Sequence, residues 1–228
     1  MSSQATLPAK PTPLLTRQRA LGAVVVLLAV LALLLVLSPP ERQLGNLVKV
    51  IYFHGALARS GMLALMAAGV LGLAYLLRPL PALVRWSNAV QVAGMAVFIA
   101  HFLLSVIPTH ETWGVWIAFD EPRTVMSLQV IGAGLVVMVV RYLVDDDRLS
   151  ALANLLLGVA VFLLSSRTGV LRHPLNPIGD STSNTIQLFY GGILITCLAL
   201  TALAAWLLAD RAGTTTQPEG ELPARPPA

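Results

Sequence analysis

Six long apolar stretches, separated by polar segments, make up most of the sequence. They cover residues 20–37, 57–77, 88–107, 125–144, 149–165 and 186–208. A helix rises about 1.5 Å per residue, so about 20 apolar residues cross roughly 30 Å of hydrocarbon, and each stretch is close to that length. The pattern predicts an all-α fold: a polytopic membrane helix bundle with six transmembrane helices, formed by residues 20–208.

The two ends of the chain are polar. Residues 1–19 contain prolines and scattered basic residues, and residues 209–228 are rich in threonine, proline and glycine. Such segments bury too little apolar surface to fold by themselves, so both are predicted to be disordered tails. The first apolar stretch is longer than the core of a signal peptide and is followed by Ser38-Pro39-Pro40, a poor cleavage site, so we expect it to stay as a membrane anchor.

The basic residues predict which way the bundle faces. With six spans both tails lie on one side, and that side carries Lys10, Arg17, Arg19, Arg78, Arg85, Arg141, Arg148, Arg211 and Arg225, against Arg42, Lys49, Arg59, Arg123, Arg167 and Arg172 on the other. Since positive charge is enriched on the cytoplasmic side, we expect cytoplasmic tails and an inner (cytoplasmic) membrane. The outer segments, residues 38–56, 108–124 and 166–185, are long, whereas the inner connections are short, so function is expected on the outer face.

Composition excludes several classes of function. Hydrophobic residues make up 56% of the chain and charged residues 11%, with a mean hydropathy of +0.77, which is too apolar for a soluble domain. The net charge is +4, but the basic residues form no dense patch, so nucleic acid is not an expected ligand. Cys197 is the single cysteine, which excludes a disulfide framework and a pair of redox thiols.

One outer segment combines aromatic and charged residues. Trp113, Trp116 and Phe119 recur at three-residue spacing, which in a helical loop would place them on one face, and Asp120 and Arg123 follow. An interfacial aromatic belt accounts for the rings, but not for the charges beside them. Such rings can support a flat porphyrin, and a guanidinium pairs with a carboxylate such as a haem propionate. Further outer-face candidates for that pairing are Arg59, Arg167 and Arg172.

The four histidines are candidate metal ligands, because imidazole is a common ligand of haem iron. His54, His110 and His173 each lie in one of the outer segments. His54 and His173 flank the aromatic segment and are predicted to be iron ligands, whereas His110 is either a ligand or an interfacial residue. His101 lies inside the third apolar stretch, roughly 9 Å deep, and is either a buried ligand or makes a hydrogen bond between helices.

The order of these pieces resembles a known family. Tyr52-Phe53-His54, Trp113-Gly114, Trp116, Phe119-Asp120, Arg123-Thr124 and His173-Pro174 look like motifs of the cytochrome c assembly family of membrane haem-handling proteins, in particular its six-span CcmC type. The resemblance implies an outer, tryptophan-rich loop that holds b-type haem non-covalently. It implies that Trp113, Trp116, Asp120 and Arg123 belong to that loop, and that His54 and His173 are the axial ligands.

The resemblance implies that the protein binds haem at the outer, periplasmic face and delivers it for cytochrome c maturation. This task consists of binding and release and needs no bond-making residues, so the protein is not expected to be an enzyme. Implied partners are the lipid bilayer, the other membrane and ATPase subunits of an ABC-type haem exporter, and a periplasmic haem chaperone. The sequence contains no P-loop, so any ATP use belongs to a partner. Two other classes stay open: a haem b subunit of a membrane electron-transfer complex, in which His101 matters more than His54, and a non-haem structural or permease subunit.

Overall fold

The computed structural model describes residues 15–172 and 178–215. In this part of the chain there is no β-strand, and six helices are each long and apolar enough to span a membrane. They are α1 (Arg17–Leu37), α2 (Leu47–Leu77), α3 (Pro81–Trp113), α4 (Pro122–Val144), α5 (Asp147–Arg167) and α6 (Asn184–Thr215). The predicted fold class, an all-α membrane bundle of six helices, is confirmed.

The first and last helices extend beyond the apolar stretches that predicted them. α1 begins at Arg17 and α6 continues to Thr215, so the parts of both predicted tails that adjoin the apolar stretches are helical. The start of α1 is capped by Thr16, whose Oγ1 accepts a hydrogen bond from the Arg19 N–H at 3.4 Å. The remaining parts of the predicted tails, residues 1–14 and 216–228, lie outside the described residues.

α2 and α3 also extend into segments that the sequence predicted as loops. α2 begins at Leu47 and α3 continues to Trp113, so His54 and His110 lie on helices. The physical reason is that backbone groups near the hydrocarbon need hydrogen-bond partners, which a continued helix supplies whatever the polarity of its side chains. α3 ends where Gly114 adopts the left-handed conformation, with φ of 71°, and donates its N–H to the carbonyl of His110 at 2.9 Å.

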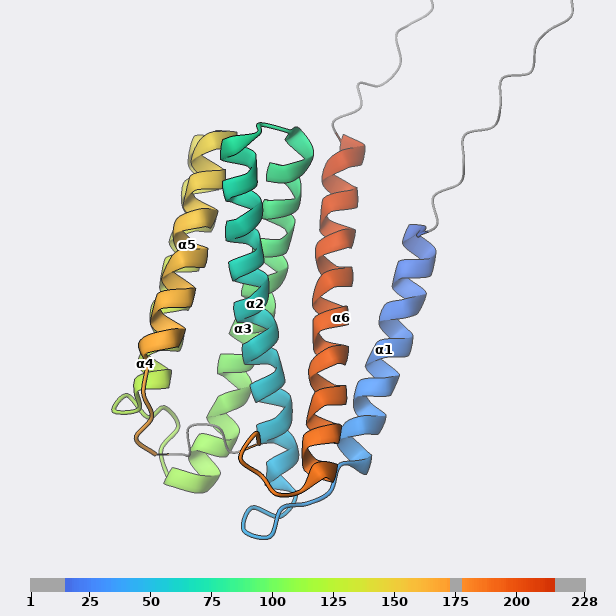
Figure 1. Cartoon of the computed structure of the whole chain (residues 1–228), viewed down its shortest axis with the longest axis vertical. Coiled ribbons are helices and arrows are strands. Elements are labelled where there is room, and N and C mark those ends of the chain that lie inside the picture. Colours follow the sequence, from blue (N-terminus) through green and yellow to red (C-terminus); the bar gives the residue numbers. More distant parts are fainter. Residues whose placement is uncertain (1–14, 173–177, 216–228) are drawn as a thin grey trace, which may run out of the picture.

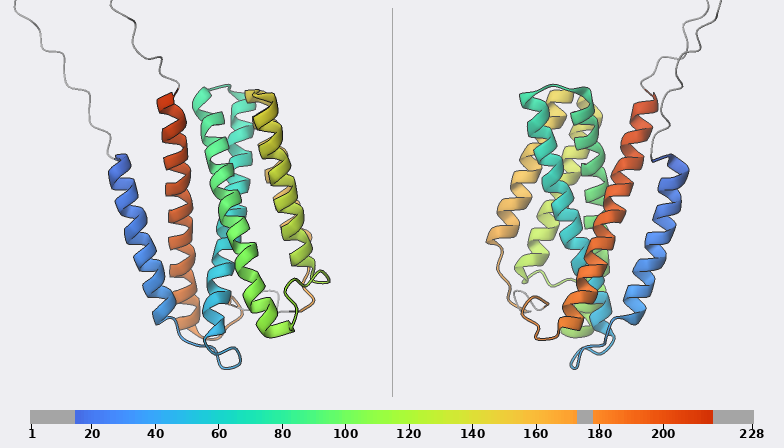
Figure 2. Two further views of the ribbon diagram at one scale, coloured as in Figure 1. Left: turned by 180° about the vertical axis from the view of Figure 1, so that it is seen from behind. Right: turned by 45° about the vertical axis from the view of Figure 1, so that its right-hand side comes forward.

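The three long connections lie at one end of the bundle, which we call the long-loop end (Figure 1). Their described parts are residues 38–46, 114–121, 168–172 and 178–183. The start of α1 and the end of α6 lie at the opposite end, together with the two short connections (Figure 1). α2 packs against α3, α5 and α6, whereas α1 lies at the edge of the bundle beside α6 (Figure 2).

Small residues bring α2 and α3 into close contact. A Cβ atom on Gly61 would lie 2.8 Å from the Cβ of Phe98, and one on Gly94 would lie 2.9 Å from the Cβ of Ala64. Neither position accepts a larger residue unless the helices move apart, which is the usual role of small residues between membrane helices. The contact fixes which faces of α2 and α3 meet, and it thereby places the histidines of the two helices side by side.

Polar contacts inside the bundle join the helices farther from the long-loop end. Asn154 of α5 donates hydrogen bonds from Nδ2 to Ser87 Oγ and Asn88 Oδ1 of α3, both at 2.9 Å. Ser87 Oγ donates in turn to the carbonyl of Ala68 in α2 at 2.8 Å. Polar groups in an apolar interior are costly unless they are hydrogen-bonded, so these contacts favour one arrangement of the three helices.

Candidate functional site

His54 of α2 and His101 of α3 lie side by side in the half of the bundle that faces the long-loop end. Their ring centroids are 5.5 Å apart and their planes differ by 13°, so the imidazoles are stacked. Phe98, one turn before His101, packs against the His101 ring with 5.3 Å between centroids. His101 Nδ1 lies 2.9 Å from the backbone carbonyl oxygen of His54. The hydrogen bond between helices that was one expected role of His101 is therefore present.

Backbone carbonyls determine the tautomer of both imidazoles. A carbonyl oxygen only accepts hydrogen bonds, so the ring nitrogen bonded to it carries the proton. His101 Nδ1 faces the carbonyl of His54, and His54 Nδ1 lies 3.3 Å from the carbonyl of Val50. In both rings the lone pair is then on Nε2. A histidine that donates its other N–H to a carbonyl is the usual form of a metal-binding histidine.

The stacked pair does not bind one metal ion from two sides in this arrangement. Two imidazoles ligate one iron when their nitrogens point at it from opposite sides, each roughly 2 Å away. Stacked rings face each other with their flat surfaces instead. Among the described residues, no group of three or more His, Cys, Asp or Glu side chains is placed to hold a bare metal ion. In this arrangement the stacked pair can supply one imidazole as an axial ligand to a metal ion.

The aromatic segment, residues 113–124, contains the connection between α3 and α4. Trp113 is the last residue of α3, and residues 114–121 are not helical, so the three aromatic rings do not share one helix face as their spacing suggested. Trp116 and Phe119 are 64% and 67% exposed. The Trp116 ring also stacks on His110 of α3, with 3.9 Å between centroids and 18° between planes. The exposed rings offer flat apolar surface to a planar ligand.

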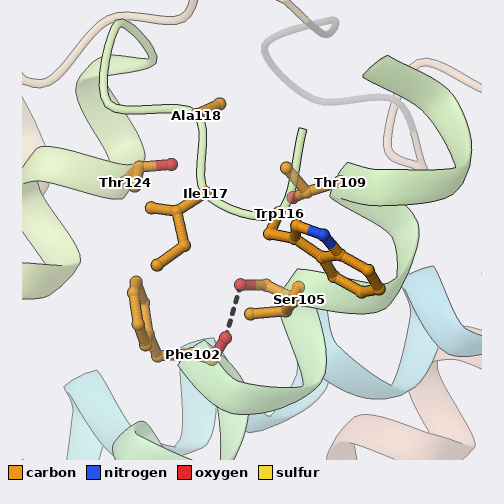
Figure 3. A pocket seen from close by; sticks show the side chains of 8 residues that line it. Phe102, Ser105, Thr109, Trp116, Ile117, Ala118 and Thr124 are labelled. Carbon is orange, nitrogen blue, oxygen red and sulfur yellow. Dashed lines mark hydrogen bonds between the residues drawn. The ribbon is translucent and has the colours of Figure 1, made fainter. Parts of the chain in front are cut away.

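A small hollow separates this segment from α3 (Figure 3). Phe102 and Ser105 of α3 line it together with Trp116 and Ile117 of the connection. It has room for about one water molecule. A porphyrin does not fit inside it, so haem would have to lie against the exposed ring faces.

Charged residues from two loops meet beside Trp113. Arg172 donates hydrogen bonds to Oδ2 of Asp120 from Nε, at 2.9 Å, and from a terminal guanidinium nitrogen. The guanidinium carbon of Arg172 also lies 5.6 Å from the centroid of the Trp113 ring, within cation–π range. The hydrogen bonds from Arg172 hold the pKa of the Asp120 carboxyl below its ordinary value of 3.8. Three predicted site residues are thus in contact, and the charge of Arg172 is balanced by Asp120.

Two more of the predicted arginines, Arg59 and Arg123, are near each other. Arg123, in the first turn of α4, is within electrostatic range of Glu121 and of Arg59. Arg59 lies on α2, with its guanidinium carbon 5.2 Å from the centroid of the Tyr190 ring of α6. Two guanidinium groups and one carboxylate leave an excess of positive charge, which attracts an anion such as a carboxylate. This region suits a propionate better than Arg172 does.

The sequence did not indicate two residues of the site, Glu121 and Tyr190, and one predicted residue is not among those that the structure describes. His173, the second predicted iron ligand, is not among the described residues. Glu121 is 1% exposed and bonds to the backbone of residues 171 and 172, a contact that sequence reasoning missed. Its one sequence signal is an acidic residue directly before Pro122, where a helix begins. Tyr190 gave no signal, because it sits within an apolar stretch.

No protein-family model matches this chain, and neither does any curated protein. The membrane-spanning architecture therefore stands on the six apolar helices, and the function has to be argued from the residues at the long-loop end.

Proposed function

We propose that this protein binds haem at its long-loop end and delivers it for cytochrome c maturation. The observation that carries the proposal is the tautomer of His54. Its Nδ1 donates to the carbonyl of Val50, which leaves Nε2 as the metal-binding nitrogen. His54 lies near the start of α2, the end of that helix at which the long connections with their aromatic and cationic residues lie. The order of motifs that resembles the cytochrome c assembly family supports the same function.

Haem suits these residues better than a bare metal ion. Structural zinc sites take four protein ligands and catalytic zinc sites three, whereas a porphyrin brings four nitrogens of its own and its iron needs one or two axial ligands. The described residues offer single imidazoles and no group of three or more metal ligands. They can therefore supply an axial ligand to haem iron, but not the three or four ligands of a zinc site. The pair of guanidinium groups at Arg59 and Arg123 fits the two carboxylates of haem.

The residues of the chain would bind and release the haem as follows. His54 ligates the iron, and His173, by the resemblance to the family, is the second ligand. Arg59 and Arg123 attract the propionates, and the exposed rings of Trp116 and Phe119 pack against the porphyrin edge. When bound, haem supplies the iron that accepts the imidazole lone pair. Nothing in this task requires a bond-making residue, so we propose a carrier and not an enzyme.

The family resemblance also supplies the proposed setting. The long-loop end would face the periplasm and both tails the cytoplasm of a bacterial inner membrane, in agreement with the bias of basic residues towards the tail side. The proposed partners are the other membrane and ATPase subunits of an ABC-type haem exporter and a periplasmic haem chaperone.

One observation favours a second function, a haem b subunit of an electron-transfer complex. His101 is inside a membrane helix, and its Nδ1 is also bonded to a carbonyl, so its Nε2 is an equally suitable iron ligand. In that case the haem would be permanently buried between helices, and His101 would be essential.

Substitution of each histidine by phenylalanine distinguishes these functions, because phenylalanine keeps a flat ring but has no lone pair. The purified protein in detergent would be titrated with haem and followed by its absorption spectrum. We expect His54→Phe and His173→Phe to lose the spectrum of ligated haem, and His110→Phe, the matched control from the same end of the bundle, to retain it. Loss with His101→Phe alone would contradict His54 as the iron ligand and favour the haem b subunit. A parent protein that binds no haem would favour a structural or permease subunit.

A further inference from the structure

A cavity lies between α3, α4 and α5, at the end of the bundle opposite to the long-loop end (Figure 1). Its volume is about 360 Å³, and pockets that bind small molecules typically measure about 300 to 1,000 Å³. One cation and three carboxylates line the same space. The polar residues of the lining are Asn88, Arg141, Asp145, Asp146, Asp147 and Ser150.

A buried amide holds Arg141 at the wall of this cavity. Arg141 Nη1 donates a hydrogen bond to Oε1 of Gln91 in α3, at 2.8 Å, and Gln91 is fully buried. A guanidinium has only donors, so the amide oxygen has to face it. The amide nitrogen, Nε2, is then left without a hydrogen-bond partner among the described residues. A buried donor without an acceptor is costly, and an anionic oxygen bound beside Arg141 would supply that acceptor.

The charges that line the cavity are not paired with one another. In the part of the chain that the structure describes, no ion pair includes Arg141 or any of the three aspartates. Asp146 caps the start of α5, where its Oδ1 accepts a hydrogen bond from the Leu149 N–H at 2.6 Å. The carboxylates of Asp145 and Asp147 remain for a cation. A ligand that carries an anion and a cation together therefore fits this cavity better than a simple ion does.

Apolar surface on α4 continues from the cavity towards the middle of the bundle. Tyr142 lines the cavity and is 87% exposed. Leu135 and Leu128 precede it at seven-residue spacing on the same side of the helix, and both are exposed. From Leu128 to Tyr142 the helix rises about 21 Å, more than half of the roughly 30 Å of hydrocarbon in a bilayer. A ligand whose polar head lies in the cavity can therefore lay an acyl chain along α4.

We propose that this cavity binds the head group of a zwitterionic phospholipid with a primary ammonium group, such as phosphatidylethanolamine. Arg141 binds the phosphate, and Asp145 and Asp147 accept hydrogen bonds from the ammonium. The Tyr142 ring packs at the boundary between head group and acyl chain, where aromatic residues of membrane proteins gather. A choline head group has no N–H to donate, and a glycerol head group has no positive charge. The site lies apart from the proposed haem site, and the inference does not depend on the proposed function.

Native mass spectrometry of the full-length protein in detergent tests the proposal. Phosphatidylethanolamine, phosphatidylcholine and phosphatidylglycerol with identical acyl chains would be added separately, and the dissociation constant of the first bound lipid measured for each. The variants are Arg141→Gln and the double variant Asp145→Asn/Asp147→Asn. The controls are Arg148→Gln, an exposed arginine in the first turn of α5, and Asp210→Asn, an aspartate of α6 at the same end of the bundle; neither residue lines the cavity.

We expect the parent to bind phosphatidylethanolamine at least about tenfold more tightly than either other lipid, as for the gain of one charge-assisted hydrogen bond. In the double aspartate variant this preference should fall to within about twofold, because the carboxylates that accept from the ammonium are gone. Arg141→Gln should weaken the binding of phosphatidylethanolamine by about tenfold. Both controls should retain the affinity and the preference of the parent.

Three results would overturn the inference. Equal binding of the three lipids by the parent would mean that they only surround the helices, and tighter binding of phosphatidylglycerol would mean that the aspartates do not select the ligand. A preference for phosphatidylethanolamine that survives in the double aspartate variant would place the lipid elsewhere. The aspartates are exposed, so this variant is expected to fold, and it decides the question even if Arg141→Gln is unstable because the contact with Gln91 is lost.

Discussion

His101 Nδ1 lies 2.9 Å from the carbonyl oxygen of His54 while the two imidazoles stack at 5.5 Å, so one side chain contacts both the backbone and the ring of its neighbour. Such a contact makes His101 a support for His54 whichever function the protein has. It also ties α2 to α3 at the level of the proposed iron ligand. A change at His101 is therefore expected to act on His54 as well as on the stability of the bundle.

Replacement of His101 by phenylalanine tests that support. The new side chain would keep a stacked ring and lose the hydrogen bond, at a cost of about 1 kcal/mol in the free energy of unfolding. With the proposed carrier function, haem still binds through His54, more weakly than in the parent. Thermal unfolding in detergent and a haem titration measure the two effects. Asn154→Ala is the control, because it removes two buried hydrogen bonds, should lower stability by at least as much, and should leave haem binding unchanged. Equal haem affinity in His101→Phe and the parent would contradict the supporting role.

The guanidinium groups of Arg59 and Arg123 predict that the affinity for haem depends on the charge of its propionates. Esterification of both propionates removes the negative charges, so the parent should bind haem dimethyl ester at least about tenfold more weakly than haem, the loss of one charge-assisted pair of about 1.5 to 3 kcal/mol. In Arg59→Gln and Arg123→Gln this preference should shrink. Arg42→Gln, a change in a loop at the same end, serves as the control. If the parent binds haem and its ester equally well, Arg59 and Arg123 do not contact the propionates.

The Asp120–Arg172 ion pair predicts a change at acid pH. Arg172 lowers the pKa of Asp120 in the folded protein, so the contribution of the pair is fully present above the ordinary value of 3.8 and is lost as pH falls through the lower, folded value. Because Arg172 also contacts Trp113, tryptophan fluorescence should change only below pH 3.8. The change should be absent in Trp113→Phe, and Asp120→Asn should show the acid spectrum already at neutral pH. A midpoint above 3.8 would contradict this account.

The close contact of α2 with α3 predicts that Gly61 tolerates no side chain. In Gly61→Ala the new methyl group would clash with Phe98, which packs on His101, so the change should destabilise the protein by about 1 to 3 kcal/mol and weaken haem binding. Gly132→Ala is the control, since its Cβ would meet nothing within 4 Å. Thermal unfolding and haem titration of the two variants provide the comparison. Equal stability of both would show that the helices can separate at little cost.

The sequence by itself determined the number of helices and their class. A stretch of about 20 apolar residues can satisfy its backbone in hydrocarbon only as a helix, so composition decides the outcome locally. It did not determine where the helices end, because at the membrane boundary polar residues are as compatible with a helix as with a loop. His54 and His110 were expected in loops for that reason, and they lie on α2 and α3.

Which residues meet was decided only by the tertiary structure. His54 and His101 are stacked because Gly61 and Gly94 let two helices approach in one register, and a periodic apolar pattern does not specify that register. Glu121 is a stronger case. Its partners are backbone N–H groups, which nearly every residue possesses, so no side chain in the sequence marks residues 171 and 172 as the ones it would bind. The sequence determined which chemical groups are present near the long-loop end, and the packing of the helices and loops decided which of them act together.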